Sequence, residues 1–259
     1  MRLAGLVLLT GIAVAFIVSF VLPYDAVSDV HTEIANAGIS AKHWLGTDHL
    51  GRDVAHRVLA GTRAFCGPGA ASAILAALAG TLLGAAAGWC GGSIAAGIRY
   101  GFTVVDSLPR FVLVLLACSI FGAGALTLAV ASAVACAPAL GEAVYARLDG
   151  LRRAEFVLAA RAHGIPDARV LGYHLLWVNA RGLVARHAAQ VFGFFLVVET
   201  SLSYLGGFGV PEPTPSWGNM LAFEFGNPSG NVCAWLAPAV ATILGVLATT
   251  IVGQDADVG

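Results

Sequence analysis

Three histidines and two aspartates stand close together in one polar stretch of this chain, and residues of these types can hold a metal ion. They are His43, His49, His56, Asp48 and Asp53. Their spacing matches no established ligand pattern, however, and Arg52 and Arg57 lie among them, where their positive charges would repel a cation. We therefore expect no metal site in this chain.

The sequence motifs of hydrolytic and ATP-binding sites are missing from the chain. It contains neither H-E-x-x-H nor G-x-S-x-G, and its one lysine, Lys42, is not part of a G-x-x-x-x-G-K-[ST] loop. We therefore predict that the chain has no catalytic residue, binds no cofactor and is not an enzyme. A membrane-embedded hydrolase is an alternative, but it would need a catalytic constellation that the sequence does not supply.

The composition indicates an integral membrane protein. Of the 259 residues, 58% are hydrophobic and only 11% are charged, whereas soluble domains carry roughly 25% charged residues. The formal net charge is −1, so no basic surface suggests nucleic acid as a partner. Membrane lipid is the expected surrounding, and transmembrane helices must position any site.

Six stretches are apolar enough and long enough to cross a bilayer as helices, which takes about 20 residues. We place these helices at residues 3–22, 64–98, 100–121, 125–145, 188–204 and 232–253. The predicted fold class is therefore an all-α membrane protein with six transmembrane helices.

Two of these helices carry patterns that predict contacts. Gly80, Gly84 and Gly88 recur every four residues in the second, a spacing of small residues that lets helices approach closely. Asp106 and Arg110 stand four residues apart in the third, where they can form an ion pair on one helix face. We expect that pair to lower the cost of both charges near lipid.

Positive charge is distributed unevenly along the chain. Seven of the 14 lysines and arginines lie between residues 147 and 186. With six spans, the loops on that side hold nine such residues and the loops on the other side hold four. Because lysine and arginine are enriched in cytoplasmic loops, we predict an N-in/C-in topology with residues 147–186 in the cytoplasm.

The loop at 147–186, between the fourth and fifth helices, is predicted to form two short helices joined by a sharp corner. Gly164 can adopt the left-handed conformation that ends the first helix. Pro166 suits the first turn of the second helix, and Asp167 places a negative charge at its N-terminus. A helix pair of this kind can lie on a membrane surface or dock into another protein.

This corner resembles the cytoplasmic coupling loop of ABC importer permeases, in which Glu-Ala-Ala and three further residues precede a Gly. Ala159, Ala160 and Gly164 match that spacing, whereas Leu158 stands where the family usually has Glu. The resemblance implies that the segment couples to an ATPase subunit. The expected coupling residues are Glu155, Leu158, Ala159, Ala160, Gly164 and Asp167.

Two further motifs resemble one branch of these permeases, the dipeptide, oligopeptide and nickel group. The first is Leu-Gly-Thr-Asp followed, after two residues, by Gly-Arg-Asp, and the second is Pro-Thr-Pro-Ser-Trp-Gly. The signature residues are Gly46, Thr47, Asp48, Gly51, Arg52, Asp53, Pro213, Pro215, Ser216, Trp217 and Gly218. The prolines of the second motif predict a stiff, non-helical connection before the sixth span.

A carboxylate lies inside the fifth predicted span. Because an ionised carboxylate that faces lipid is costly, we expect Glu199 to face a pore or a partner subunit. Ser201 and Ser203 follow it and would lie on the same possible translocation path. The alternative is that Glu199 simply reaches water at the outer membrane interface.

The resemblance covers residues 44–253 and implies the permease subunit of an ATP-driven importer in a bacterial or archaeal cytoplasmic (inner) membrane. It also implies a second homologous permease subunit, two cytoplasmic ATPase subunits that hold ATP and Mg, and an extracytoplasmic solute-binding protein. The implied solute is a peptide or a related small molecule, with nickel included. An ion-coupled secondary transporter is the alternative, but it would need more intramembrane ionisable residues than the chain has.

These predictions divide the chain into three parts. Residues 1–63 would hold the first span and an extracytoplasmic loop with an interfacial helix around residues 52–59. Residues 64–253 would form the five-helix permease core, including the coupling loop. Residues 254–259 would be a short cytoplasmic tail.

Overall fold

The computed structural model of this chain describes residues 2–22, 24, 29–152, 154–225, 227 and 230–255. Within these residues every regular element is helical and no strand is formed, which agrees with the predicted all-α class. The elements are α1 (Arg2–Val21), the 3-10 turn η1 (Thr32–Ile34), α2 (Val54–Cys90), α3 (Gly92–Asp106), α4 (Arg110–Phe121), α5 (Ala125–Leu151), α6 (Glu155–Ala162), α7 (Asp167–Arg169), the π-helical segment η2 (Val170–Trp177), α8 (Arg181–Leu205), α9 (Trp217–Glu224) and α10 (Val232–Asp255).

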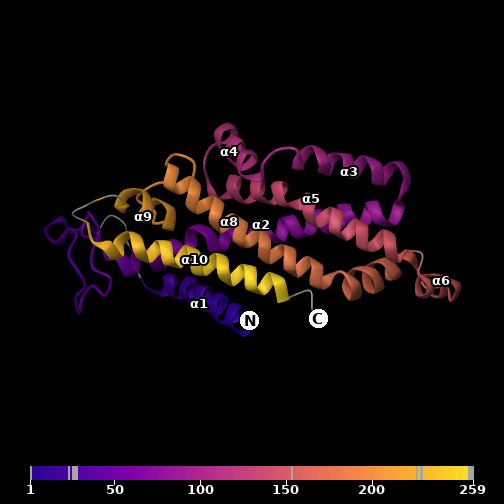
Figure 1. The fold of residues 1–259 in the computed structure, drawn as a ribbon, viewed down its shortest axis with the longest axis horizontal. Helices are drawn as coiled ribbons and strands as arrows, with labels where there is room; N and C mark the ends of the chain where they lie inside the picture. The colour runs from indigo at the N-terminus through magenta and orange to yellow at the C-terminus, as the bar shows by residue number, and fades with distance from the viewer. Residues whose placement is uncertain are drawn as a thin grey trace.

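The described residues contain five helices that are long and apolar enough to cross a membrane. These are α1, α2, α5, α8 and α10, and α3 with α4 meets the same criterion as a pair that bends by 82°. The long helices run side by side along the long axis of the molecule (Figure 1). The fold is therefore an elongated helical bundle, as a multi-pass membrane protein requires.

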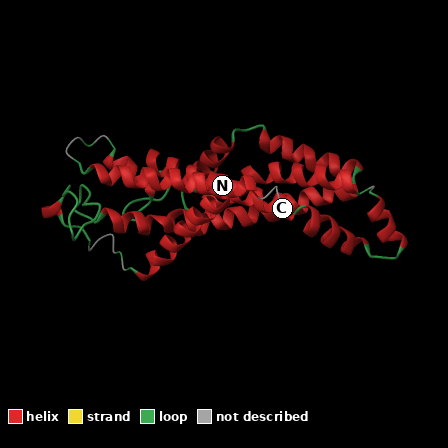
Figure 2. Ribbon diagram, turned by 60° about the horizontal axis from the view of Figure 1, so that its bottom comes forward, coloured by secondary structure: helices red, strands yellow, loops and turns green. Residues whose placement is uncertain are grey.

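The two ends of the bundle carry different structures (Figures 1 and 2). Residues 29–53 and α9 lie at one end, which we call the loop end, and α6 projects at the other, which we call the corner end. The start of α1 and the end of α10 lie near each other in both views, both well away from the loop end. The loop end and the corner end are thus held apart by the full length of the bundle.

Helix α2 packs against α5 through Gly80, Gly84 and Gly88. A Cβ atom on Gly84 would lie 2.3 Å from the carbonyl oxygen of Gly141, and one on Gly80 would lie 2.8 Å from that of Ala137. At Gly88 the same atom would lie 2.8 Å from Leu148 Cβ. The predicted role of this glycine repeat in close helix packing is confirmed.

The prediction of one continuous third helix over residues 100–121 is wrong. α3 begins at Gly92 and ends at Asp106, and α4 starts only at Arg110. Pro109 causes the break, because it lacks an N–H group and disfavours a helical conformation at the residue before it. Asp106 and Arg110 do not pair as expected: both are exposed, and no ion pair among the described residues includes either of them.

Helix α2 is longer than the predicted second span. It runs without interruption from Val54, so the interfacial helix expected there forms its first turns, and the proposed domain boundary at residue 63 falls inside it. At the other end of the chain, α10 extends through residues 254 and 255. The remainder of the predicted tail, residues 256–259, lies outside the described residues.

Candidate functional site

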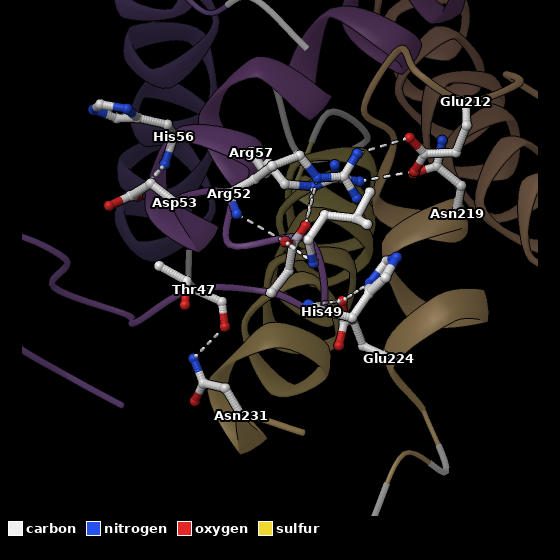
Figure 3. A network of polar contacts seen from close by, with 12 residues as sticks. Thr47, His49, Arg52, Asp53, His56, Arg57, Glu212, Asn219, Glu224 and Asn231 are labelled. Carbon is white, nitrogen blue, oxygen red and sulfur yellow. Dashed lines mark hydrogen bonds and ion pairs between the residues drawn. The ribbon is translucent and has the colours of Figure 1, made fainter. Parts of the chain in front are cut away.

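Four charged side chains from distant parts of the sequence meet at the loop end (Figure 3). Asp48 and Arg52 precede α2, Arg57 lies in its first turns, and Glu212 belongs to the connection between α8 and α9. We call Asp48, Arg52, Arg57 and Glu212 the loop-end cluster. It contains two positive and two negative groups.

The arginines of the cluster bridge the two carboxylates. Arg52 Nε donates to Asp48 Oδ2 at 2.7 Å, and Arg52 Nη1 donates to Glu212 Oε2 at 3.1 Å. Arg57 Nη2 donates to Glu212 Oε1 at 2.9 Å, and its Nε lies 3.5 Å from Asp48 Oδ2. The cluster therefore ties the segment before α2 to the connection before α9 by charge-assisted hydrogen bonds.

Three members of the cluster are almost fully removed from solvent. Asp48 and Arg52 are each 2% exposed and Arg57 is 1% exposed. Burial alone would favour the neutral form of Arg52, but the carboxylates of Asp48 and Glu212 outweigh it and raise the pKa of this guanidinium. Each buried charge thus depends on its oppositely charged partners.

The backbone before α2 folds to place Asp48 in the cluster. Asp48 Oδ1 accepts hydrogen bonds from the backbone N–H groups of Leu50 and Arg52, both at 2.9 Å. Gly51 has a φ of +74°, and a Cβ atom there would lie 1.8 Å from the carbonyl oxygen of His31, so only glycine fits. Asp53 then caps α2 by accepting from His56 N at 2.9 Å. The signature residues Asp48, Gly51 and Asp53 therefore determine the turn that precedes α2.

The other signature residues of this motif join the turn to its surroundings. Thr47 Oγ1 accepts from Ala37 N at 2.8 Å, and Gly46 lies against the carbonyl oxygen of Ala37. Asn231, just before α10, donates to the carbonyl oxygen of Leu45 at 2.7 Å. The turn is thus held from two sides.

The second signature motif positions α9 against α2 and α8. Ser216 caps α9 through a reciprocal pair of hydrogen bonds with Asn219, and Trp217 Nε1 donates to the carbonyl oxygen of Val58 in α2 at 2.9 Å. A Cβ atom on Gly218 would lie 2.2 Å from the carbonyl oxygen of Thr200 in α8. Pro213 and Pro215 lie in a non-helical segment, residues 206–216, but the helix α9 follows it, so the connection before the sixth span is only in part non-helical as predicted.

A group that resembles a metal site occurs at the loop end, but its donors do not suit a cation. Ligand atoms of Asp48, His49 and Glu224 lie within 4.8 Å of one another. The Asp48 carboxylate already accepts from two backbone N–H groups and from Arg52, whose positive charge opposes a cation. His49 Nδ1 instead contacts Glu224 Oε1 directly, which links the loop to α9.

The structure buries Glu199. Its side chain is 0% exposed, so the chain itself covers it. Ser203 Oγ donates to Glu199 Oε1 at 2.7 Å and accepts from Val210 N at 2.9 Å. Ser203 is buried as well, whereas Ser201 is half-buried. These hydrogen bonds help to hold the connection after α8 in place, and the translocation path through Glu199, Ser201 and Ser203 stays a prediction.

At the corner end the predicted pair of short helices is present. α6 ends in a Schellman motif, in which Ile165 N donates to Ala160 O at 3.0 Å and Gly164 N donates to Arg161 O at 2.9 Å. Gly164 has the expected positive φ, +75°. Arg161 spans the corner through an ion pair with Asp167 at 2.9 Å, and its guanidinium lies 4.7 Å from the ring centroid of Trp89.

Of the six predicted coupling residues, Ala160 is partly buried and the other five are exposed. Val157 is fully buried and Ala160 is partly buried against the same apolar cluster, which includes Leu148. The predicted residues Glu155, Leu158, Ala159, Gly164 and Asp167 are exposed, and so is Phe156. The corner therefore presents an outer face of mixed polarity that the chain itself leaves uncovered.

Sequence reasoning did not identify three residues of the loop end. Arg57 was considered only as a charge that repels a metal, and Glu212 and Glu224 were not singled out. Glu212 bonds to Arg57 across a sequence separation of 155 residues, and Glu224 contacts His49 across a separation of 175. The one sequence signal for Glu212 is its position directly before the Pro-Thr-Pro-Ser-Trp-Gly motif.

Comparison with known proteins identifies a family and several relatives. Residues 80–254 match a family described as binding-protein-dependent transport system inner membrane component. The chain is 32% identical over 251 residues to the glutathione transport system permease protein GsiD of Pectobacterium atrosepticum, across 97% of this chain and 83% of that protein.

Two further relatives carry related names. A putative peptide permease protein of Brucella suis biovar 1 is 34% identical over 258 residues, across 96% of this chain and 83% of that protein. The dipeptide transport system permease protein DppC of Alkalihalophilus pseudofirmus is 29% identical over 222 residues, across 86% of this chain and 72% of that protein.

Proposed function

Since this chain belongs to the family of binding-protein-dependent transport system inner membrane components, we propose that it conducts small peptides across the inner membrane. It is a permease subunit of an ABC importer, it crosses a bacterial inner membrane several times, and ATP hydrolysis lies on separate subunits. Partners of such a subunit include an ATPase and a solute-binding protein.

The observation that carries the proposal is the position of the two motif regions. The loop-end cluster and the exposed corner lie at opposite ends of one helical bundle (Figure 1). A permease must receive its solute on one side of the membrane and contact its ATPase on the other. We assign the solute-receiving side to the loop end and the ATPase-contacting side to the corner end.

The proposed assembly contains one copy of this chain, a second homologous permease, two ATPase subunits and one binding protein. ATP and Mg would bind to the ATPase subunits alone. Closure of the ATPases would move the corner, and the helices between the two ends would carry that movement to the loop end. Peptides are the proposed solute class because the compared relatives are named for glutathione, dipeptides and peptides, whereas none of these names points to nickel.

Transport by the complete transporter in liposomes tests this function. The chain would be co-expressed with its partner subunits, reconstituted into liposomes with the ATPase side outward, and supplied with the binding protein and labelled dialanine in the lumen. We expect ATP-dependent export of dialanine from the lumen and no movement when the ATPase lacks its P-loop lysine. Transport of nickel ions but of no peptide would contradict the proposed solute class.

For topology we propose the N-in/C-in arrangement with the corner end in the cytoplasm. The start of α1 and the end of α10 both lie away from the loop end in Figure 1, which supports this arrangement, as does the concentration of arginine between residues 147 and 186. In this arrangement α3 and α4 together form the third of six crossings. Ala159 would then face the cytoplasm and Thr214 the outside, and both positions are exposed.

Thiol labelling tests the topology directly. In a variant without the five native cysteines, Thr214→Cys is expected to react with a membrane-impermeant maleimide added to intact cells. Ala159→Cys should react only after the membrane is permeabilised. Labelling of Ala159→Cys in intact cells would contradict the proposed orientation.

Two substitutions at the corner are expected to uncouple the ATPases. Gly164→Val places a β-branched residue at a φ of +75°, which costs on the order of 1–3 kcal/mol locally and misaligns the two short helices. Ala159→Trp adds bulk to the exposed face of α6, whereas Ala160 is partly buried against the core of the chain and is a poorer choice. Both variants should reach the membrane but lose most co-purification with the ATPases.

Ala123→Trp is the matched control for added bulk, because Ala123 is exposed in the connection between α4 and α5, away from α6. It should co-purify with the ATPases as the unchanged protein does. We expect the exposed apolar residues Phe156, Leu158 and Ala159 to supply most of the contact, so raised salt should weaken it little. If both corner variants retained normal coupling, the corner would serve only as a charged anchor.

A further inference from the structure

The break between α3 and α4 carries two opposite charges that form no ion pair in the described part of the chain. Asp106 is the last residue of α3 and Arg110 the first residue of α4. Both are exposed, and among the described residues neither takes part in an ion pair. The chain bends by 82° at this point.

The break lies within the apolar part of the bundle. Val105, next to Asp106, borders the same apolar groove as Leu75 of α2 and Val130 of α5. The nearest charged residues along those two helices, Arg63 and Glu142, are each about three helical turns away from these positions. The two charges therefore lie at a depth where lipid would otherwise surround them.

Lipid is a poor environment for this segment. Charged side chains and non-helical backbone occur at membrane depth where they are buried in protein or line a water-filled cavity. α3 and α4 lie on the opposite side of the bundle from α1 and α10 (Figure 1). The exposed surface of α1 is apolar, as a lipid-facing helix requires. Because lipid does not accommodate the two charges, the side that carries the break must face a water-filled path or the second permease.

The signs of the charges are unfavourable for the helices that bear them. A helix C-terminus is partly negative, yet α3 ends with an aspartate, and a helix N-terminus is partly positive, yet α4 begins with an arginine. The partly negative end of α3 therefore reinforces the charge of Asp106, and the partly positive end of α4 reinforces that of Arg110. The break attracts a cation at Asp106 and an anion at Arg110, a few residues apart.

From these unpaired intramembrane charges we propose that the α3–α4 break binds the two charged ends of a zwitterionic solute, with its ammonium group at Asp106 and its carboxylate at Arg110. This inference rests on the proposed function and narrows its solute class. Four residues of chain span at most about 14 Å. The site therefore fits the free termini of a dipeptide or tripeptide better than those of a long peptide.

Transport kinetics of the reconstituted complete transporter test the proposal. Asp106→Asn and Arg110→Gln should each lower dialanine transport about tenfold, because each removes one charge-assisted hydrogen bond to the solute. Asp106→Glu should restore most of the activity. Arg99 of α3 and Glu142 of α5 form an ion pair outside the break. The double substitution Arg99→Gln and Glu142→Gln removes this pair and should change transport less than twofold.

Thiol labelling separates solute contact from a merely structural role. In the cysteine-free background, Asp106→Cys and Arg110→Cys should react with a hydrophilic impermeant maleimide, and dialanine with its binding protein should slow the reaction. Val104→Cys and Val112→Cys are the matched controls, since both valines are exposed on the adjoining turns of α3 and α4. Dialanine should not alter their labelling.

The outcomes distinguish this inference from the proposed function. If the unchanged transporter moves dialanine but the charge-removing variants move it equally well, the inference is overturned and the function stands. The same holds if the two cysteines at the break stay unlabelled, since the charges would then be buried against the second permease. If the unchanged transporter moves no peptide, both the function and this inference are overturned.

Discussion

Replacement of Asp48 by alanine is expected to destabilise the loop end by about 3–5 kcal/mol, the usual cost of removing one partner from a buried ion pair. Asp48 is 2% exposed and contacts Arg52 at 2.7 Å and Arg57 at 3.5 Å. Without it, two buried guanidinium groups share the single carboxylate of Glu212. The backbone N–H groups of Leu50 and Arg52 also lose their acceptor.

Thermal unfolding in detergent and limited proteolysis of the loop end would measure this effect. The variant should unfold at a lower temperature and be cleaved faster between residues 29 and 53. Glu33→Ala is the control, because the Glu33 side chain is 72% exposed and contacts only His31 at 3.6 Å; an exposed pair of this kind contributes about 0–1 kcal/mol. Equal stability of Asp48→Ala and Glu33→Ala would show that the cluster does not hold the loop end together.

Addition of a single methyl group at Gly84 is expected to separate α2 from α5. The new Cβ atom would lie 2.3 Å from the carbonyl oxygen of Gly141, and that oxygen belongs to a helix backbone that cannot turn away. Insertion of extra carbon atoms into a tight core costs about 1–3 kcal/mol, and a rigid backbone contact belongs at the upper end of that range. Gly84→Ala should therefore lower both the unfolding temperature and the yield of folded protein.

Gly101→Ala in α3 is the matched control, and its expected effect on stability is opposite to that of Gly84→Ala. A Cβ atom at Gly101 meets no other atom within 4 Å. In a helix interior the same change of glycine to alanine stabilises by roughly 0.5–1 kcal/mol. If Gly84→Ala and Gly101→Ala changed the unfolding temperature alike, helix propensity rather than helix contact would govern the effect.

Where a structural feature depends on neighbouring residues in the chain, the sequence was sufficient to predict it. The long apolar stretches predicted the all-helical class, because each helix satisfies its own backbone groups whatever its neighbours are. The corner at Gly164 was predicted for the same reason, since the hydrogen bonds of a helix terminus involve only residues a few positions apart. The glycine repeat of α2 indicated close packing but not its partner helix.

Where a feature depends on residues far apart in the chain, only the tertiary structure decided it. The sequence placed Glu199 in an apolar span, and the fold determined that its side chain is fully buried. The sequence allowed Asp106 and Arg110 to pair on one helix, and the break at Pro109 separated them. Glu212 was recognised only from its contacts with Arg52 and Arg57. The physical reason is that burial and ion pairing are set by which helices meet, and no local pattern of residues specifies that meeting.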